Sequence, residues 1–234
     1  MTEIKIIKKV LAANDAIAEL NLKFFAEKGI LTMDIMSSPG SGKTLILEKT
    51  IARLKDKYKC GVIEGDVSTT NDSVRLQKLG VEVVQINTDA FGGDCHLEAE
   101  WIKDAALNFD LDNLDILFVE NVGNLVCPAE FQTGMDFNIV ILSTPEGEDK
   151  PVKYPLMFRE SQVMIINKMD LLPYLDIDVK LMKDNAKKIN PELKILSLSA
   201  KTEEGFDEWI EWIETEVEKK KVPLRIKVQE KKSD

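Results

Sequence analysis

The sequence has little thiol and almost no imidazole. It contains three cysteines (Cys60, Cys95 and Cys127) and one histidine in 234 residues. So few cysteines, in an odd number, exclude a disulfide framework and are typical of a protein from a reducing compartment. We therefore expect the cysteines to bind metal or to pack in the core.

Long apolar runs are also missing. The longest stretches, such as LDILFVENVGNLV and NIVILS, have the length of strands and contain polar residues, so we expect no membrane-spanning segment. The first residues, MTEIKIIKKVLAAND, contain neither a continuous apolar segment nor a small-residue cleavage site, so no secretory signal is predicted. We therefore expect a cytoplasmic protein.

Positive charge is scarce as well. The formal net charge is −10, whereas a nucleic-acid-binding surface needs a basic stripe, so no nucleic-acid partner is expected. Lysines are concentrated in VEKKKVPLRIKVQEKKSD at the C-terminus, where we predict a charged, solvated tail over residues 219–234. The hydrophobic content of 44% is ordinary for a soluble protein and predicts a sizeable core.

Short apolar runs alternate with longer amphipathic ones from residue 30 onward. This alternation predicts an α/β fold with a mostly parallel, doubly wound sheet flanked by helices. Continuous apolar residues in several strands indicate burial on both faces of the sheet. The predicted strands are 30–36, 60–64, 81–86, 115–120, 136–143, 163–167 and 193–199, and the predicted helices are 41–57, 72–78, 97–107, 178–188 and 206–219.

A further helix is predicted before the first strand. Apolar residues recur at helical spacing over residues 4–27, at Ile7, Leu11, Ile17, Leu20 and Phe24. The stripe packs either on its own domain or on a partner, and we favour its own domain. We thus predict three parts: an N-terminal helix over 1–28, a nucleotide-binding domain over 29–218 and the tail over 219–234.

The first predicted strand runs into the stretch MSSPGSGKT. It matches the phosphate-loop pattern G-x-x-x-x-G-K-[ST], except that Ser37 replaces the leading glycine. A turn of small residues before a helix presents backbone N–H groups to phosphate. Lys43 is expected to reach the β- and γ-phosphates, and the Thr44 hydroxyl to hold Mg²⁺. The candidate residues are Ser38, Pro39, Gly40, Ser41, Gly42, Lys43 and Thr44.

Two polar stretches resemble the guanine-reading motifs of GTPases. VMIINKMD and SLSAK each end a predicted strand, where ligands of doubly wound sheets bind. Asp170 can accept two hydrogen bonds from the guanine N1–H and 2-amino group, a contact that adenine cannot make. A strand that runs into an ordinary polar turn is the weaker alternative. The six candidate residues are Asn167, Lys168, Asp170, Ser199, Ala200 and Lys201.

Carboxylates near two other strand ends are candidates for the magnesium and switch region. Where GTPases usually carry D-x-x-G, this chain has E-x-x-G, from Glu120 to Gly123. Asp66 and Asp72 lie around the end of the second strand, although one of them could instead cap the following helix. We predict a catalytic set of Lys43, Thr44, Asp66, Asp72 and Glu120, of which the last four contact magnesium.

The residues after Gly123 predict a slow reaction. Many GTPases place Gln or His there to orient the attacking water, whereas this chain has Asn124 and Leu125. We therefore expect slow intrinsic hydrolysis of GTP.

The single histidine, His96, directly follows Cys95, and Cys127 lies four residues beyond Gly123. Thiolate and imidazole suit nickel, zinc or copper better than magnesium or calcium, so we predict a metal site formed by these three residues. Three ligands are one short of a closed zinc site, so water or a second chain must complete it. A helix N-terminus with Cys95 packed inward is the alternative. Cys60 is expected in the core.

Together these motifs resemble the HypB family, GTPases that assist nickel insertion during [NiFe]-hydrogenase maturation. The resemblance covers residues 10–217 and depends on SSPGSGKT, EGD, DCHLEA, ENVGNLVCPAEF, GEDKPVKYPLMF, INKMDLLPYLD and LSAKTEEG. Ser37 is usual in that family. The resemblance implies a P-loop GTPase of the dimerising (SIMIBI) kind, a homodimer promoted by GTP, and a nickel or zinc site at Cys95, His96 and Cys127. It also implies two partners, a HypA-type nickel/zinc maturation protein and the hydrogenase large-subunit precursor.

The sequence departs from the family pattern in several respects, and it has neither the N-terminal cysteine motif nor the His-rich stretch that many members carry. The family usually reads F-D-L-G-E where this chain has FQTGM, Phe131 to Met135, so two acidic groups near the metal site are missing. Lys150 or Lys153 is implied near the dimer interface and is left out of the predicted site. Two alternative functions remain: an accessory GTPase of another nickel or cobalamin pathway, such as the urease one, and a structural zinc protein that binds nucleotide.

Overall fold

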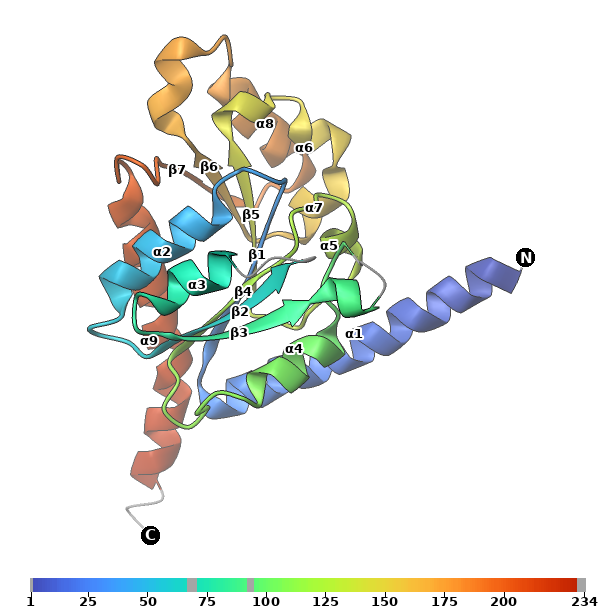
Figure 1. Ribbon diagram of the computed structural model, residues 1–234, viewed down its shortest axis with the longest axis vertical. Coiled ribbons are helices and arrows are strands. Elements are labelled where there is room, and N and C mark those ends of the chain that lie inside the picture. Colours follow the sequence, from blue (N-terminus) through green and yellow to red (C-terminus); the bar gives the residue numbers. More distant parts are fainter. Residues whose placement is uncertain (1, 67–70, 92–94, 231–234) are drawn as a thin grey trace.

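The computed structural model describes residues 2–66, 71–91 and 95–230, and a parallel sheet lies at its centre (Figure 1). The strand order is β3-β2-β4-β1-β5-β6-β7, and every neighbouring pair is parallel. This confirms the predicted doubly wound α/β sheet, and the strand ends differ from the prediction by at most two residues. The strands are β1 (Leu31–Ser37), β2 (Cys60–Asp66), β3 (Glu82–Asn87), β4 (Ile116–Glu120), β5 (Phe137–Ser143), β6 (Val163–Asn167) and β7 (Lys194–Ser197).

Helices cover both faces of the sheet (Figure 1). Short helices α5, α6 and α7 were not predicted, because one or two turns are too short to show a helical repeat in the sequence. The helices are α1 (Thr2–Lys28), α2 (Lys43–Leu54), α3 (Asn71–Gln77), α4 (Ala99–Ala106), α5 (Cys127–Glu130), α6 (Lys150–Lys153), α7 (Pro155–Glu160), α8 (Val179–Ile189) and α9 (Phe206–Glu230), with 3₁₀ turns η1 (Thr88–Phe91), η2 (Thr144–Glu146) and η3 (Met169–Tyr174).

One face of the sheet has a single core under α2 and α9. Alternate residues of β1, Met33 and Ile35, pack there with Ile51 of α2 and Trp209 of α9. The indole of Trp209 is fully buried, and its N–H donates to Thr50 Oγ1 at 2.9 Å. Full burial of a large apolar side chain contributes roughly 1.5–3 kcal/mol, so this face is a main source of stability.

The other face has two separate cores. One lies over β2 and β4 and contains Phe25 of α1 and Ile102 of α4. The other lies over β5 and β6 and contains Phe158 of α7 and Met182 of α8. Strand β1 lies between β4 and β5, so its residues on this face lie at the boundary of the two cores.

Asp34 of β1 lies at this boundary and is buried. Its carboxylate accepts hydrogen bonds from Thr133 Oγ1 (2.7 Å) and from Asn121 Nδ2 (3.1 and 3.2 Å to its two oxygens). The segment between β4 and β5 is thereby attached to the middle of the sheet. Burial raises the pKa of Asp34 to about 6.

The buried line of α1 differs from the predicted stripe. Asn14, Ala18, Asn21 and Phe25 are buried at helical spacing, whereas Leu20 is 56% exposed. The apolar pattern was misleading because two asparagines hydrogen-bond to buried backbone groups and therefore lie inside. The predicted residue Ile7 lies outside the side chains that the structure describes.

Most of the predicted C-terminal tail continues helix α9. Helix α9 crosses the predicted boundary at residue 219 and continues to Glu230. Lys220 forms an ion pair with Asp136, and Lys221 pairs with Asp115 at 2.6 Å. These two carboxylates lie just before β5 and β4, so the two ion pairs attach this part of α9 to the edge of the sheet where those strands begin. Residues 231–234 of the predicted tail lie outside the described residues.

Helices α1 and α9 have 27 and 25 residues, but both contain many charged residues. Within the part of the chain that the structure describes, no helix combines the length and the apolar character needed to cross a membrane.

The buried Asp34 predicts a pH-dependent stability. Because its pKa rises from 3.8 to about 6 on burial, the folded state holds the proton more tightly than the unfolded chain does. This contribution is fully present below the unfolded pKa of 3.8 and is lost as the pH rises through about 6, a change on the order of 3 kcal/mol. In urea titrations between pH 4 and pH 7, Asp34→Asn is expected to show a smaller decrease in unfolding free energy than wild type. An unchanged decrease contradicts this account, and Asp112→Asn, at an exposed carboxylate, is the control that keeps the wild-type slope.

Candidate functional site

The phosphate-loop residues connect β1 to α2 at the carboxyl edge of the sheet. Gly42 precedes α2 with φ of 100°, a left-handed conformation that suits glycine. An added Cβ at Gly42 would lie 2.5 Å from Asn167 Nδ2, so the loop and the end of β6 are in close contact. The ammonium of Lys43 donates to Ser37 Oγ at 2.9 Å, which gives the atypical serine a role in orienting the lysine.

A buried carboxylate lies beside the threonine of the loop. Thr44 Oγ1 donates to Glu120 Oε1 at 2.8 Å, and Glu120 Oε2 is buried without a hydrogen-bond partner among the described residues. Burial raises the pKa of Glu120 to about 7, although nearby Lys43 opposes the rise. Burial likewise lowers the pKa of Lys43, with Glu120 opposing. A hydroxyl and a buried carboxylate with an unused oxygen are the ligands that Mg²⁺ prefers.

A second buried carboxylate, Glu64, was missed by the sequence analysis. Glu64 of β2 is the register partner of Glu120 on β4, and Ser73 Oγ donates to it at 2.8 Å. Burial raises its pKa to about 7, and the charge of Glu120 adds to the rise. The available signal was a glutamate inside an otherwise apolar strand, which is unusual unless the group is hydrogen-bonded or functional.

The two candidate aspartates lie on either side of residues 67–70, which are not among the described residues. Asp66 ends β2, and Asp72 is the second residue of α3. Asp72 therefore lies within the helix and not at its cap position, and it pairs with Arg75 at 3.0 Å. The charge of Asp72 opposes the lowering of the Lys43 pKa and adds to the rise of the Glu120 pKa. Its carboxylate therefore belongs to the same electrostatic cluster.

The base-reading candidates line one cavity. Its volume is about 320 Å³, and the phosphate loop contributes to it through Gly42. Asp170 accepts a hydrogen bond from Ser199 Oγ at 2.7 Å, so the two predicted motifs meet there. A larger hollow of about 570 Å³ lies at the opposite edge of the sheet, beside Tyr58 and Gly80, away from these motifs. The candidate residues that line the smaller cavity are Asn167, Lys168, Asp170, Ala200 and Lys201.

The side chain of Asn167 joins the two loops on either side of this cavity. Its Nδ2 donates to Ser41 O at 2.9 Å, and its Oδ1 accepts from Ala200 N at 3.0 Å. Lys168, in a left-handed conformation with φ of 61°, donates from Nζ to Gly40 O at 2.7 Å. The amide and the ammonium therefore hold the phosphate loop against the base-reading loop.

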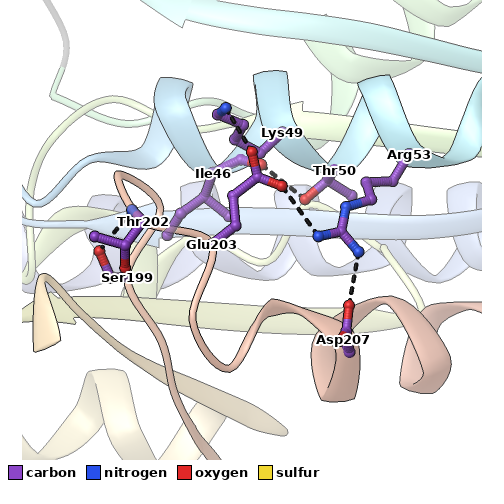
Figure 2. Close-up of polar contacts among 8 residues, drawn as sticks. All are labelled: Ile46, Lys49, Thr50, Arg53, Ser199, Thr202, Glu203 and Asp207. Carbon is purple, nitrogen blue, oxygen red and sulfur yellow. Dashed lines mark hydrogen bonds and ion pairs between the residues drawn. The ribbon is translucent and has the colours of Figure 1, made fainter. Parts of the chain in front are cut away.

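Glu203 fastens the second base-reading loop to α2 (Figure 2). Its carboxylate accepts from Lys49 Nζ at 2.6 Å and from Arg53 at 3.0 Å, and Arg53 also pairs with Asp207 at 2.7 Å. These hydrogen bonds hold the pKa of Glu203 below its usual value. The Glu203 N–H donates to Ser199 O at 2.8 Å, so the loop is attached both to the helix and to itself.

The remaining nucleotide candidates, Ser38, Pro39 and Gly123, lie at the outer side of the phosphate loop. Ser38 Oγ hydrogen-bonds to Glu146, a residue that the sequence analysis missed. Gly123 lies directly against the loop, because an added Cβ would be 3.2 Å from Pro39 Cα. The segment that follows Glu120 therefore touches the phosphate loop.

The three predicted metal ligands come together. One ligand atom each of Cys95, His96 and Cys127 lies within 4.8 Å of the other two. His96 is buried, and its ring stacks on Phe131 with centroids 3.7 Å apart. Burial, together with neighbouring Cys95, raises the pKa of the Cys127 thiol to about 11. Two sulfurs and one imidazole form a donor set suited to nickel or zinc. Cys60 is buried in the core under α2 and α9, as predicted.

Comparison with known proteins places the chain in a broad class first. Residues 31–197 match the family model described as "CobW/HypB/UreG, nucleotide-binding domain". With its phosphate loop at the end of β1, the protein is a P-loop GTPase of this class.

Individual relatives narrow the class. The hydrogenase maturation factor HypB of Escherichia coli K12 is 48% identical over 216 residues, which are 92% of this chain and 73% of that protein. The crystal structure of HypB from Helicobacter pylori in complex with nickel superposes with a TM-score of 0.82 at 38% identity, covering 88% of this chain and 96% of that one. HypB from Archaeoglobus fulgidus gives a TM-score of 0.81 at 39% identity, covering 88% and 99%. The chain therefore belongs to the HypB family of hydrogenase maturation factors.

The phosphate loop offers a matched pair of glycine variants. Gly40 and Gly42 both have positive φ, but an added Cβ meets nothing within 4 Å at Gly40 and meets Asn167 at Gly42. Gly40→Ala is expected to lower the unfolding free energy of the nucleotide-free protein by about 1 kcal/mol through backbone strain alone. Gly42→Ala is expected to cost about 2–4 kcal/mol, because it also displaces the Asn167 amide from its partners. Chemical denaturation measures both values, and equal losses contradict the steric explanation.

Proposed function

We propose that this chain is a GTP-dependent metallochaperone that assists nickel insertion into [NiFe]-hydrogenase. The observation that carries the proposal is the cluster of Cys95, His96 and Cys127 within one ligand shell, a few residues from the nucleotide site. Family membership supports it, because the relatives are hydrogenase maturation factors and a HypB structure contains nickel.

The nucleotide roles follow from the geometry of the loop and the cavity. The backbone N–H groups of residues 38–42 and the Lys43 ammonium bind the phosphates. Thr44 and Glu120, together with Asp66 and Asp72, would hold Mg²⁺, which would supply charge stabilisation to the phosphates. Asp170 reads the guanine edge, and the loop of Ser199, Ala200 and Lys201 closes the other side of the cavity.

Metal binding at the Cys/His cluster must displace thiol protons. Because burial raises the pKa of Cys127 to about 11, metal competes with a tightly held proton. Three protein ligands leave room for a fourth from water, from a second chain or from an acceptor protein.

The metal cluster and the nucleotide site share one stretch of chain. Glu120, the magnesium candidate, ends β4, Gly123 lies against Pro39 of the phosphate loop, and Cys127 begins α5. A shift of this stretch on GTP binding or hydrolysis moves Cys127 relative to Cys95 and His96. We propose that GTP promotes a homodimer in this way, and that a HypA-type maturation protein and the hydrogenase large-subunit precursor are the partners in metal transfer.

Cysteine variants test the metal role. Cys95→Ala and Cys127→Ala are each expected to abolish the thiolate-to-metal charge-transfer absorption that Ni²⁺ or Co²⁺ produces, because each removes one of only two sulfurs. Binding of a fluorescent GTP analogue should stay within about twofold of wild type, since neither cysteine is among the residues that line the base cavity. Cys60→Ala is the control and should keep the absorption, because Cys60 lies outside the cluster. Unfolding of the wild-type protein on chelation of metal supports a structural zinc site instead.

Sedimentation tests the coupling to GTP. A non-hydrolysable GTP analogue with Mg²⁺ should shift the protein from monomer towards dimer, whereas GDP should not, because only the γ-phosphate reaches the stretch around Gly123. Lys43→Ala, which removes the phosphate-binding ammonium, should remain monomeric with either nucleotide. A wild-type protein that stays monomeric with the analogue contradicts the proposed coupling.

A further inference from the structure

The two halves of the metal cluster come from separate segments. Cys95 and His96 lie just before α4, whose first residue is Ala99, and Cys127 begins α5, which leads into residues 131–134. Direct contacts between the segments include a long hydrogen bond of 3.5 Å from Asn124 Nδ2 to Cys95 O and the stacking of His96 on Phe131. Something more must hold the two halves at a fixed separation.

Two asparagines of α1 connect the segments. Asn14 accepts from Ala99 N at 2.9 Å through Oδ1 and donates to Gln132 O at 2.8 Å through Nδ2. Asn21 Nδ2 donates both to Ala99 O at 2.7 Å and to Thr133 O at 3.1 Å. Each side chain therefore binds the backbone of both segments, on the Cys95 side and on the Cys127 side.

The backbone of the Cys127 segment lies directly on α1. Asn14 and Asn21 are seven residues apart and lie on one face of the helix, with Ala18 between them. Gly134 has φ of 81°, and an added Cβ would lie 2.1 Å from Ala18 O, so no larger residue fits between the segment and the helix. Thr133 is held from its other side, because its hydroxyl donates to Asp34.

The burial of these amides points to a specific purpose. Asn14 and Asn21 are only 5% and 1% exposed. Positions buried to this degree on a helix are ordinarily occupied by apolar side chains. Phe25 lies one turn beyond Asn21 on the same face and already supplies apolar anchoring, since it is fully buried in the core under α4. Buried asparagines that each bridge two chain segments specify a separation, whereas apolar contacts tolerate sliding.

We propose that α1 sets the geometry of the Cys/His cluster, with Asn14 and Asn21 as positioning residues that keep the ligand atoms of Cys95 and His96 within 4.8 Å of that of Cys127. The proposal rests on the proposed metal function of that cluster. Loss of these bridges lets the two ligand-bearing segments move apart and weakens metal binding, so α1 affects the affinity of a site to which it supplies none of the three proposed ligands.

The test compares two variants of the full chain that both weaken α1 packing. Asn14→Ala/Asn21→Ala removes the four hydrogen bonds, whereas Phe25→Leu loosens the apolar anchor and keeps them. Co²⁺ titration of the nucleotide-free proteins, followed by thiolate-to-metal absorption, should show affinity at least about tenfold weaker in the double asparagine variant and within about twofold of wild type in Phe25→Leu. Equal weakening in both variants overturns the proposal, because it assigns the effect to helix packing in general, and so does wild-type affinity in the asparagine variant.

A metal-free measurement separates this proposal from the proposed function. In a Cys60→Ala background, diamide oxidises the two remaining thiols, Cys95 and Cys127, to a disulfide and takes up their two hydrogens. The rate reports how closely the two sulfurs are held. The asparagine double variant should form this disulfide at least about tenfold more slowly than Phe25→Leu, whether or not metal binds. If the two variants differ in this rate but the wild-type protein binds no metal, the metallochaperone function is contradicted and the positioning role still holds. Equal rates in the two variants contradict the positioning role.

Discussion

All seven strands of the described structure run parallel, and this one constraint determines where the candidate site residues lie. Parallel strands end at a common edge, so the residues that follow each strand converge there whatever their separation in the sequence. The phosphate loop after β1, Glu120 at the end of β4 and Asn167 at the end of β6 meet in this way. The helices cover the two faces of the sheet and leave the edge at the carboxyl ends of the strands available for ligands.

The boundary between the two cores on one face of the sheet has a different character. It is polar where apolar packing is the rule: Asp34 of β1 binds Asn121 and Thr133, and α1 adds its own asparagines from the outside. A segment held by directional hydrogen bonds takes one position or another, whereas a segment held by apolar contacts adjusts gradually. The chain between β4 and β5, which carries Cys127, is therefore held in a defined position by directional contacts from two sides.

Much of this organisation could be predicted from the sequence. Strands were found because buried parallel strands are continuous apolar runs, and the phosphate, base and metal motifs were found because each has a fixed order of residue types. The contacts that join the motifs could not be found in the same way. Nothing in the residue pattern shows that Asn167 bonds to Ser41, that Glu203 binds Lys49, or that Glu64 lies beside Glu120, since these pairs depend on strand order and loop geometry.

The misplaced stripe of α1 has the same origin. Apolar periodicity assigned Leu20 to the buried face, yet Leu20 is exposed and Asn21 is inside, because the partner surface presents backbone carbonyls instead of side chains. Lys220 and Lys221 were predicted to lie in solvent for a similar reason. The pattern of charge does not show that Asp136 and Asp115 lie beside them. Polar partners distant in the sequence decide both cases.

The amide of Asn167 also affects the entropy cost of ligand binding in the cavity. It joins two walls of the cavity, the phosphate loop at Ser41 and the loop at Ala200. The conformational entropy of aligning the two walls is therefore lost during folding and not during binding. A pocket whose walls are already aligned loses less conformational entropy when a ligand binds than a pocket that must close around it, so the same contacts give tighter binding.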